Sequence, residues 1–452
     1  MIKRLLIANR GEIAVRIIRS CREMGIETVA VYSEADRDSL HVRLADRSVC
    51  IGPAPPAKSY LVKENLIMAA LHTDCGAVHP GVGFLSENPE FARLVRDQGL
   101  LFIGPDPEVI ELLGDKVRAR ATAQKYGLPV TPGTGAVSGE TIQAAEALGF
   151  PVIIKAAAGG GGRGMRIVRR AEDLRDNISI ASREAEENFA DGTVFIEKYL
   201  ENPRHVELQI IADGSNAAVL GERDCTVQKN HQKLIEESPS PAVSAGMRRA
   251  MTAAAVPLFR ELKYRGAGTI EFLVEEGKFY FMEVNARVQV EHPVSEFVSG
   301  VDIIRQQILA CTEGRLELPG QADAAAAGEA DFPAEPPLSG WAMECRINAL
   351  TPGKITRLEV PGGPGVRFDS FLYPGYSVPP HYDSMVAKLI VHETDRNHAL
   401  ARMDRALREL VIDGIATNKE RQRWIINHPV FHYGVFGTSW YENIEKEVEH
   451  VQ

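Results

Sequence analysis

The sequence predicts a multidomain protein that combines an α/β lobe carrying a parallel sheet with α+β lobes built from antiparallel strands. Residues 3–33 alternate strand, helix and strand patterns, which indicates a βαβ unit and a parallel sheet with covered faces. Residues 268–292 read as two strands joined by a short turn, which is the pattern of an antiparallel hairpin. With 452 residues, the chain is long enough for two or three domains.

Composition and charge narrow the function classes. The formal net charge is −10, from 51 basic and 61 acidic residues, which argues against nucleic-acid binding by bulk charge and still allows a local basic site for phosphates. No apolar run approaches membrane-spanning length, and the apolar stretch near the start is too short for a signal peptide. Six scattered cysteines without a CxxC pair fit reduced thiols rather than a disulfide framework or a zinc site. We therefore expect a cytoplasmic protein without nucleic-acid or membrane partners.

The N-terminal α/β lobe is expected to span residues 1–113. Its strands are expected at 3–8 and 27–33 and in ADRSVCIG, CGAVHPG and LLFIGP, with a helix at 10–25. The Gly-rich loop HPGVGFLSEN at 79–88 leads into a helix at 88–98, which Ser86 can cap with Glu87 beside it. A helix start near a strand end predicts an anion or substrate site, and a structural turn explains these residues equally well.

The middle lobe, expected at 114–201, carries a glycine-rich segment between two strands, 152–156 and 165–168. Three of its glycines formally match the dinucleotide fingerprint GxGxxG, at Gly159, Gly161 and Gly164. No helix begins there, so we reject that interpretation. A glycine run between paired strands instead suits a flap whose backbone N–H groups wrap phosphates, and Lys155 just before it can reach a phosphate as a point charge.

The hairpin at 268–292 carries two acids in apolar strands, Glu271 and Glu283. With a three-residue loop at 276–278, Val274 would pair with Tyr280 and the two carboxylates would face each other. Like charges facing across a ladder repel, and a divalent cation would offset the repulsion. The amide oxygen of Asn285 has the same strand parity as Glu283, and this set of oxygen donors suits Mg²⁺.

Arg287, Gln289 and Glu291 follow at every second position. If this part of the chain stays extended, the three side chains point to one side, next to the metal. The alternative is an amphipathic hairpin with a solvated face, and a four-residue loop would place the two acids on opposite faces of the sheet.

The C-terminal lobe is expected to span 202–452. Strands are expected at 205–213, 217–228, 344–350 and 379–392, and helices at 245–262, 300–313 and 395–412. Residues 228–240 bring Gln228, His231 and Lys233 together, and a solvated basic loop is the alternative. Arg346 lies in a strand between apolar neighbours, where it is either an anion clamp or a structural ion pair. Residues 315–339 are biased toward Ala, Pro and Glu and predict a mobile insertion.

Taken together, these segments resemble biotin carboxylase, a member of the ATP-grasp superfamily, over essentially the whole chain. The resemblance is carried by IANRGEIAVR, HPGVGFLSEN, GDK, the glycine segment after Lys155, EKYLENPRHVE, ERDCTVQKNHQK, EVNARVQVEHPV and ECRINA, which follow the family's order and spacing. The resemblance implies an N-terminal α/β lobe, a small lid with the glycine flap, and a larger C-terminal lobe, with ATP between the lid and the C-terminal lobe.

Carried over by position, the resemblance implies a site residue set. ATP would be bound by Lys116, Lys155, Gly161, Gly162, Glu197, Leu200, His205, Gln228 and His231, with backbone atoms near Lys198 and Tyr199 at the adenine edge. Glu271, Glu283 and Asn285 would hold Mg²⁺ or Mn²⁺. Bicarbonate would be held by Lys233, Arg287, Gln289 and the backbone of Val290. Glu291 would be the general base, and Arg346 would face the ureido oxygen of biotin.

The implied activity is the first half-reaction of acetyl-CoA carboxylase or a related enzyme, and acetyl-CoA carboxylase serves fatty acid biosynthesis. ATP and bicarbonate form carboxyphosphate, which carboxylates biotin. The chain has no Met-Lys-Met biotinylation motif, so the carrier protein and the carboxyltransferase are expected on separate chains. Arg19, Glu23 and Arg367 match the family's dimer region, which predicts a homodimer. Val82, Ala158 and Pro364 depart from the family pattern, as do the lengths near residues 348 and 315–339.

Two alternatives stay open. One is a different ATP-grasp ligase that activates another carboxylate, which would cleave ATP without requiring bicarbonate. The other is a nucleotide-binding regulatory subunit, and the intact set of Glu271, Glu283, Arg287 and Glu291 argues against it. The final acceptor, whether acetyl-CoA, another acyl-CoA or pyruvate, is not encoded in these motifs.

Overall fold

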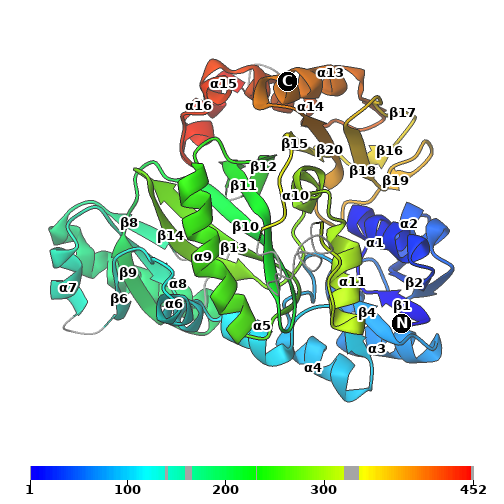
Figure 1. The fold of residues 1–452 in the computed structure, drawn as a ribbon, viewed down its shortest axis with the longest axis horizontal. Coiled ribbons are helices and arrows are strands. Elements are labelled where there is room, and N and C mark those ends of the chain that lie inside the picture. The colour runs from blue at the N-terminus through cyan, green and yellow to red at the C-terminus, as the bar shows by residue number, and fades with distance from the viewer. Residues whose placement is uncertain (1, 138–140, 158–164, 231, 320–334, 449–452) are drawn as a thin grey trace, which may run out of the picture.

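The computed structural model describes residues 2–137, 141–157, 165–230, 232–319 and 335–448. Among them are a five-stranded, a four-stranded and an eight-stranded sheet. In Figure 1 the five-stranded sheet lies at the right and the four-stranded sheet at the left, and the eight-stranded sheet lies between them and extends toward the C-terminal helices at the top. The domain boundaries expected from the sequence stay a prediction.

The N-terminal sheet is parallel and has the strand order β3-β2-β1-β4-β5. Its elements are β1 (Arg4–Ile7), α1 (Gly11–Glu23), β2 (Glu27–Tyr32), α2 (Leu40–Leu44), β3 (Arg47–Cys50), α3 (Lys63–His72), β4 (Ala77–His79), α4 (Pro89–Asp97), β5 (Leu101–Phe102) and α5 (Pro107–Gly114). All four residues of β1 are buried, which explains its continuous apolar run in the centre of a covered sheet. The predicted βαβ start is therefore confirmed.

The predicted cap of helix α4 is wrong. Asn88, not Ser86, is the N-cap residue, and its side chain accepts a hydrogen bond from the Phe91 N–H. Proline at the first helical position already fixes the start of the helix one residue after Asn88. Glu87 does not support the helix but points to a distant segment, as described below.

The four-stranded sheet has the order β6-β9-β7-β8 and antiparallel pairings. The elements here are α6 (Lys116–Lys125), β6 (Gly133–Ala136), α7 (Thr141–Ala147), β7 (Val152–Ala156), β8 (Met165–Val168), α8 (Leu174–Phe189) and β9 (Val194–Lys198). The two strands predicted around the glycine segment pair as expected. The glycine flap, with Gly161 and Gly162, lies outside the described residues.

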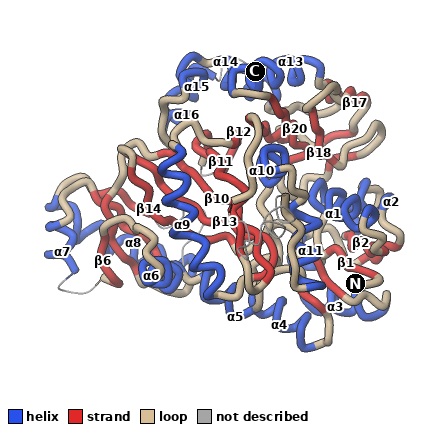
Figure 2. Tube along the Cα trace, viewed as in Figure 1, coloured by secondary structure: helices blue, strands red, loops and turns tan. Residues whose placement is uncertain are grey.

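The eight-stranded sheet is antiparallel and has the order β14-β13-β10-β11-β12-β15-β20-β18. Its strands and the helices packed on it are β10 (Arg204–Asp213), β11 (Ala217–Lys229), β12 (Gln232–Ser238), α9 (Ala245–Glu261), β13 (Arg265–Glu275), β14 (Lys278–Asn285), α10 (His292–Ser299), α11 (Ile303–Glu313), β15 (Trp341–Asn348), β18 (Val366–Ser370) and β20 (Met385–Glu393). Residues 228–229 and 232–238 thus belong to two paired strands rather than to a solvated loop. Helix α10, which the sequence did not predict, covers this sheet (Figure 2).

The remaining elements complete the C-terminal end. They are β16 (Gly353–Lys354), β17 (Arg357–Glu359), β19 (Ser377–Val378), α13 (Arg396–Glu409), β21 (Val411–Asp413), α14 (Lys419–Asn427), α15 (Pro429–Tyr433) and α16 (Trp440–Val448). Helix α13 buries Leu400, Met403 and Leu407 in a core shared with β15 and β20. Among the described helices, none has the length and apolar character needed to cross a membrane. All six cysteines are free thiols.

Candidate active site

The hairpin places the two predicted acids opposite each other, by a different route from the one expected. The loop has two residues, Glu276 and Gly277, both with positive φ, so Val274 pairs with Phe279 rather than Tyr280. A bulge at Met282 then shifts the register by one residue, which brings Glu271 opposite Glu283. The predicted loop is wrong and the predicted pairing of the acids is confirmed, because the bulge compensates for the shorter loop.

The acidic row continues on β10 and ends at an arginine on β11. Glu207 of β10 lies directly opposite Glu271, and Arg223 of β11 lies opposite Glu207. Arg223 is fully buried and donates from Nε to Glu207 Oε1 at 2.6 Å, while its other nitrogens reach Gln209, Thr269 and Ser295. One buried guanidinium therefore fixes the inner end of a row of three carboxylates.

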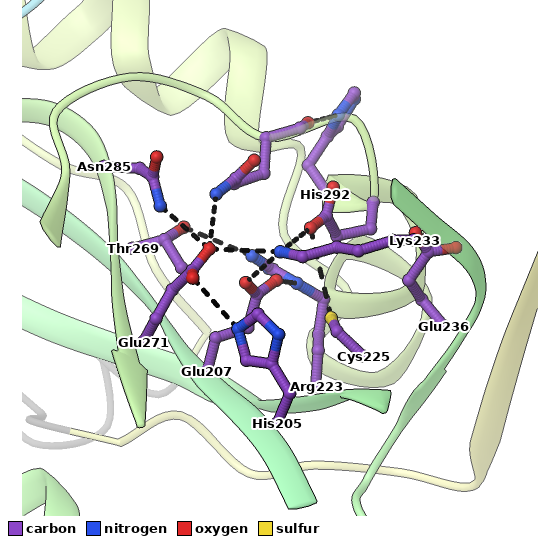
Figure 3. Close-up of polar contacts among 12 residues, drawn as sticks. His205, Glu207, Arg223, Cys225, Lys233, Glu236, Thr269, Glu271, Asn285 and His292 are labelled. Carbon is purple, nitrogen blue, oxygen red and sulfur yellow. Dashed lines mark hydrogen bonds and ion pairs between the residues drawn. The ribbon is translucent and has the colours of Figure 1, made fainter. Parts of the chain in front are cut away.

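Lys233 of β12 lies among these acids (Figure 3). Its ammonium is 2.7 Å from Glu207 Oε2, 3.1 Å from Glu271 Oε1 and 2.7 Å from Glu291 Oε1. Burial lowers the pKa of Lys233, but the surrounding acids outweigh it and raise the pKa well above its ordinary value. The site therefore holds a buried, permanently charged cation that can face an anion.

Glu291 is fully buried between two cations. Lys233 contacts one of its oxygens, and Arg346 donates to the other at 3.0 Å. Burial raises the pKa of Glu291, but Lys233 and Arg346 outweigh it and lower the pKa well below the usual carboxyl range. Arg346 also contacts Glu236 Oε1 at 2.5 Å, and burial raises the pKa of Glu236 to about 7. The ion-pair interpretation of Arg346 is therefore confirmed, and the anion-clamp interpretation stays a prediction.

Residues 286–291 leave the sheet after Asn285 and are neither helix nor strand, so the extended continuation did not form. Their polar side chains nevertheless converge. Arg287 donates to Asn285 Oδ1 at 3.1 Å, to Gln289 Oε1 at 2.8 Å and to Glu87 Oε2 at 2.7 Å. Glu87 also accepts from the Ala286 N–H at 2.9 Å. A loop of the N-terminal lobe thus holds this segment in place.

A single cavity of about 1190 Å³ collects nearly all of the described residues predicted for the site. Its lining includes Lys116, Lys155, Glu197, Lys198, Tyr199, Leu200, His205, Gln228, Lys233, Glu271, Glu283, Asn285, Arg287, Gln289, Val290 and Arg346. Glu291 lies just behind the wall, in contact with Lys233 and Arg346. His231 lies outside the described residues, as do Gly161 and Gly162.

One end of the cavity combines exposed apolar side chains with cations. Met165 and Ile167 of β8 line it and are 37 % and 45 % exposed, which leaves an apolar surface open to a ligand. Lys155 contacts Glu197 at 2.5 Å, beside Arg120. The backbone N–H groups of Lys198 and Tyr199 donate to the carbonyls of Pro132 and Pro151, so these two donors are already paired, and recognition of adenine by this segment stays a prediction.

His205 connects this end to the acids. Its Nε2 lies 2.9 Å from Glu271 Oε2, and its Nδ1 lies 2.6 Å from Gln228 Nε2. Because the same Gln228 nitrogen donates to the Cys225 carbonyl, Nδ1 of His205 accepts and Nε2 donates to Glu271. Gln228 therefore sets the histidine tautomer that orients the acid.

The chemistry of the donor set fits a hard divalent cation at Glu271, Glu283 and Asn285. The two carboxylates face each other there and offer hard oxygen ligands. Asn285 donates from Nδ2 to Glu271 Oε1 at 2.9 Å and its Oδ1 accepts from Arg287, so this amide must turn before its oxygen could join the two carboxylates. Glu283 is 33 % exposed, 3.2 Å from Lys116, and open to water. A second cluster of candidate donors joins His205, Glu207 and Glu271, but Lys233 already contacts both acids.

Several candidate functional residues were not predicted from the sequence. They are Glu87, Arg120, Glu207, Arg223, Glu236 and Lys388. Glu207 had the same signal that found Glu271, a carboxylate between apolar neighbours in a strand. The partners of Glu87 lie 199 and 200 residues away, which no local pattern reveals.

Comparison with known proteins places the chain in a family. The models of the biotin carboxylase N-terminal domain, the carbamoyl-phosphate synthase L chain ATP-binding domain and the biotin carboxylase C-terminal domain match residues 1–110, 115–318 and 344–443. A biotin carboxylase of Allochromatium vinosum is 51 % identical over 95 % of this chain and 96 % of its own length.

Two solved structures are similar over the whole chain. One is a Campylobacter jejuni biotin carboxylase–βγ-ATP complex, with a TM-score of 0.91 and 45 % identity over 98 % of this chain and 99 % of that one. The other is the biotin carboxylase domain dimer of the Hydrogenobacter thermophilus 2-oxoglutarate carboxylase with MgADP, ADP and bicarbonate, with a TM-score of 0.90 and 40 % identity over 99 % of both chains. The predicted ATP-grasp fold class is confirmed.

Proposed function

The chain belongs to the biotin carboxylase family, and from this premise we propose that it is a ligase that carboxylates biotin with bicarbonate at the expense of ATP. The products are ADP, phosphate and N-carboxybiotin. The observation that carries the proposal is that Lys233, Arg287 and Gln289 line one cavity beside the acidic row, with Glu291 directly behind its wall in contact with Lys233. This arrangement suits a small anion next to a metal-bound nucleotide tail.

Bicarbonate is a poor nucleophile, and in this proposal Glu291 takes its proton. Lys233 and Arg346 stabilise the charged carboxylate of Glu291, which lowers its pKa. When a bound anion also interacts with Lys233 and Arg346, these cations stabilise the Glu291 carboxylate less. Glu291 is then a stronger base. Arg287 and Lys233 then neutralise the charge that bicarbonate presents to the γ-phosphate.

The nucleotide is proposed to lie between the four-stranded sheet and the eight-stranded sheet. Lys116 and Lys155 would contact its phosphates, and Glu197, Leu200, His205 and Gln228 would line its base and ribose. Glu271, Glu283 and Asn285 would hold Mg²⁺ or Mn²⁺, which bridges phosphate oxygens and offsets their charge when bound. The bound MgADP and bicarbonate named for the Hydrogenobacter structure support this assignment.

The acceptor end is proposed to lie at Arg346. Carboxyphosphate breaks to CO₂ and phosphate, the phosphate takes the proton of the biotin nitrogen, and that nitrogen attacks CO₂ to give N-carboxybiotin. Arg346 would stabilise the resulting enolate oxygen, since its guanidinium lines the cavity while Glu236 orients it from behind. We propose a biotin carrier protein and a carboxyltransferase as partners on separate chains, a homodimer, and a cytoplasmic location.

The test of this function is ATP cleavage by the purified chain. We expect phosphate release that requires bicarbonate and a divalent metal, rises with free biotin, and stops when EDTA removes the metal. Product analysis should detect N-carboxybiotin from labelled bicarbonate. Phosphate release that is indifferent to bicarbonate would contradict the proposal and favour a different ATP-grasp ligase.

Glu283→Gln tests the proposed metal site. The variant keeps the shape of the side chain and removes a charged oxygen ligand, so we expect the Mg²⁺ concentration for half-maximal ATP cleavage to rise more than about tenfold. The measurement is phosphate release against Mg²⁺ concentration. Glu261→Gln, at an exposed position at the end of α9, is the matched control and should behave as the parent. An unchanged Mg²⁺ requirement in Glu283→Gln would exclude Glu283 as a ligand.

A further inference from the structure

Lys388 is a buried lysine in the middle of strand β20, and the proposed reaction gives it no role. Its side chain is 0 % exposed, and its neighbours Ala387 and Leu389 are fully buried in the core. Placing an ammonium in such a position is strongly unfavourable unless it is paired and hydrogen-bonded. Its partners therefore indicate what it does.

The ammonium connects two distant parts of the chain. Its Nζ donates to the backbone carbonyl of Val290 at 2.7 Å and lies 3.1 Å from Oε2 of Glu12, in the first turn of α1. Asp369 of β18 lies directly opposite Lys388 in the sheet. Burial lowers the pKa of Lys388, but Glu12, Glu344 and Asp369 outweigh it and raise the pKa, which keeps the ammonium charged.

The Val290 carbonyl that Lys388 contacts lies in the segment that carries the residues proposed to bind bicarbonate. Residues 286–291 carry no strand ladder, so individual contacts must fix their backbone. Glu87 holds Ala286, and His292 donates from Nδ1 to the Gln289 carbonyl at 2.7 Å. The Val290 carbonyl belongs to the peptide that joins Val290 to Glu291, so holding it restricts the backbone angles that orient the Val290 N–H and the Glu291 side chain.

We propose that Lys388 is a positioning residue for the bicarbonate site: paired with Glu12, it holds the Val290 carbonyl and thereby aims Gln289, the Val290 N–H and Glu291 at the anion. This inference rests on the proposed function, which assigns bicarbonate to that segment. Because Glu12 belongs to the N-terminal lobe, the contact also makes the geometry of the anion site depend on the packing of α1.

The test is the double variant Lys388→Met/Glu12→Gln, which removes the ammonium without leaving Glu12 as an unpaired buried charge. In ATP cleavage assays on the full chain, we expect KM for bicarbonate to rise about tenfold, equivalent to about 1.4 kcal/mol. KM for ATP should stay within about twofold, because Lys388 does not line the cavity and Glu12, which does, pairs with Lys388 rather than with a residue predicted to bind ATP. Lys63→Met, which removes an exposed ion pair with Glu90, is the matched control.

Two results would overturn the proposal: an unchanged KM for bicarbonate, or an equal rise in both KM values, which would indicate a general structural role. If the double variant does not fold, Glu12→Gln alone decides. That variant keeps the Val290 hydrogen bond but loosens the ammonium, so about a threefold rise in KM for bicarbonate supports the proposal and no rise overturns it. Failure of the proposed function itself is separate, since the parent chain would then show no bicarbonate-dependent cleavage.

Discussion

Glu291→Gln is expected to lower the rate of biotin carboxylation by about 10²- to 10⁴-fold, the range that a positioned general base contributes. Glutamine has nearly the same shape and keeps an oxygen for Lys233 or Arg346, but it cannot accept the bicarbonate proton. Because Glu291 lies behind the cavity wall and contacts no residue predicted to bind the adenine, ATP affinity should stay within about threefold of the parent. Labelled-bicarbonate incorporation and ATP titration measure the two quantities.

The control for this variant is Glu420→Gln, at an exposed ion pair on α14 whose residues are not part of the cavity lining. Near-parent carboxylation by Glu291→Gln would show that another group takes the proton. A parallel loss of ATP affinity would show instead that Glu291 supports the whole cavity through Lys233. Only a selective loss of carboxylation identifies Glu291 as the base.

Local patterns were sufficient for the acids because a strand repeats every two residues. Glu271 and Glu283 each interrupt an apolar strand, and the short loop between them limits the register to a few choices. The bulge at Met282 was not predictable, since an extra residue in a strand has no composition of its own. The correct pairing therefore came from two compensating deviations.

Long-range partners were not predictable in the same way. Lys388 stands in the apolar run MVAKLIVHE, which signals a buried charge but not its partners Glu12 and Val290. Helix α10 was missed because its start, Glu291–His292–Pro293, continues a polar alternation that reads as extended chain. The resemblance supplied roles for the site residues by position, and the three-dimensional packing supplied the supporting groups around them.

Arg287→Ala is expected to lower carboxylation by about 10²- to 10³-fold, comparable to the loss of one fixed donor at a developing charge. The three guanidinium nitrogens of Arg287 donate to Glu87, Gln289 and Asn285. Removing the side chain therefore also removes hydrogen bonds that orient the amides of Gln289 and Asn285. Arg287→Lys should recover little activity, because a point charge cannot reproduce the planar fork. ATP affinity should change little, since Arg287 contacts none of the residues predicted to bind the nucleotide.

A second variant, at Glu87, tests how far the effect of Arg287 depends on its position rather than on its charge. Glu87→Gln keeps Arg287 in place but removes the charge that holds its Nε, so a smaller loss, about tenfold, is expected if positioning by the N-terminal lobe matters. Arg93→Ala, at an exposed ion pair with Glu111, is the matched control. Arg287 donates to Asn285 of the proposed metal site and to Gln289 of the proposed anion site. Its position therefore links the geometry of the two sites. Near-normal carboxylation by Arg287→Ala would therefore remove bicarbonate from this position, whatever the fold.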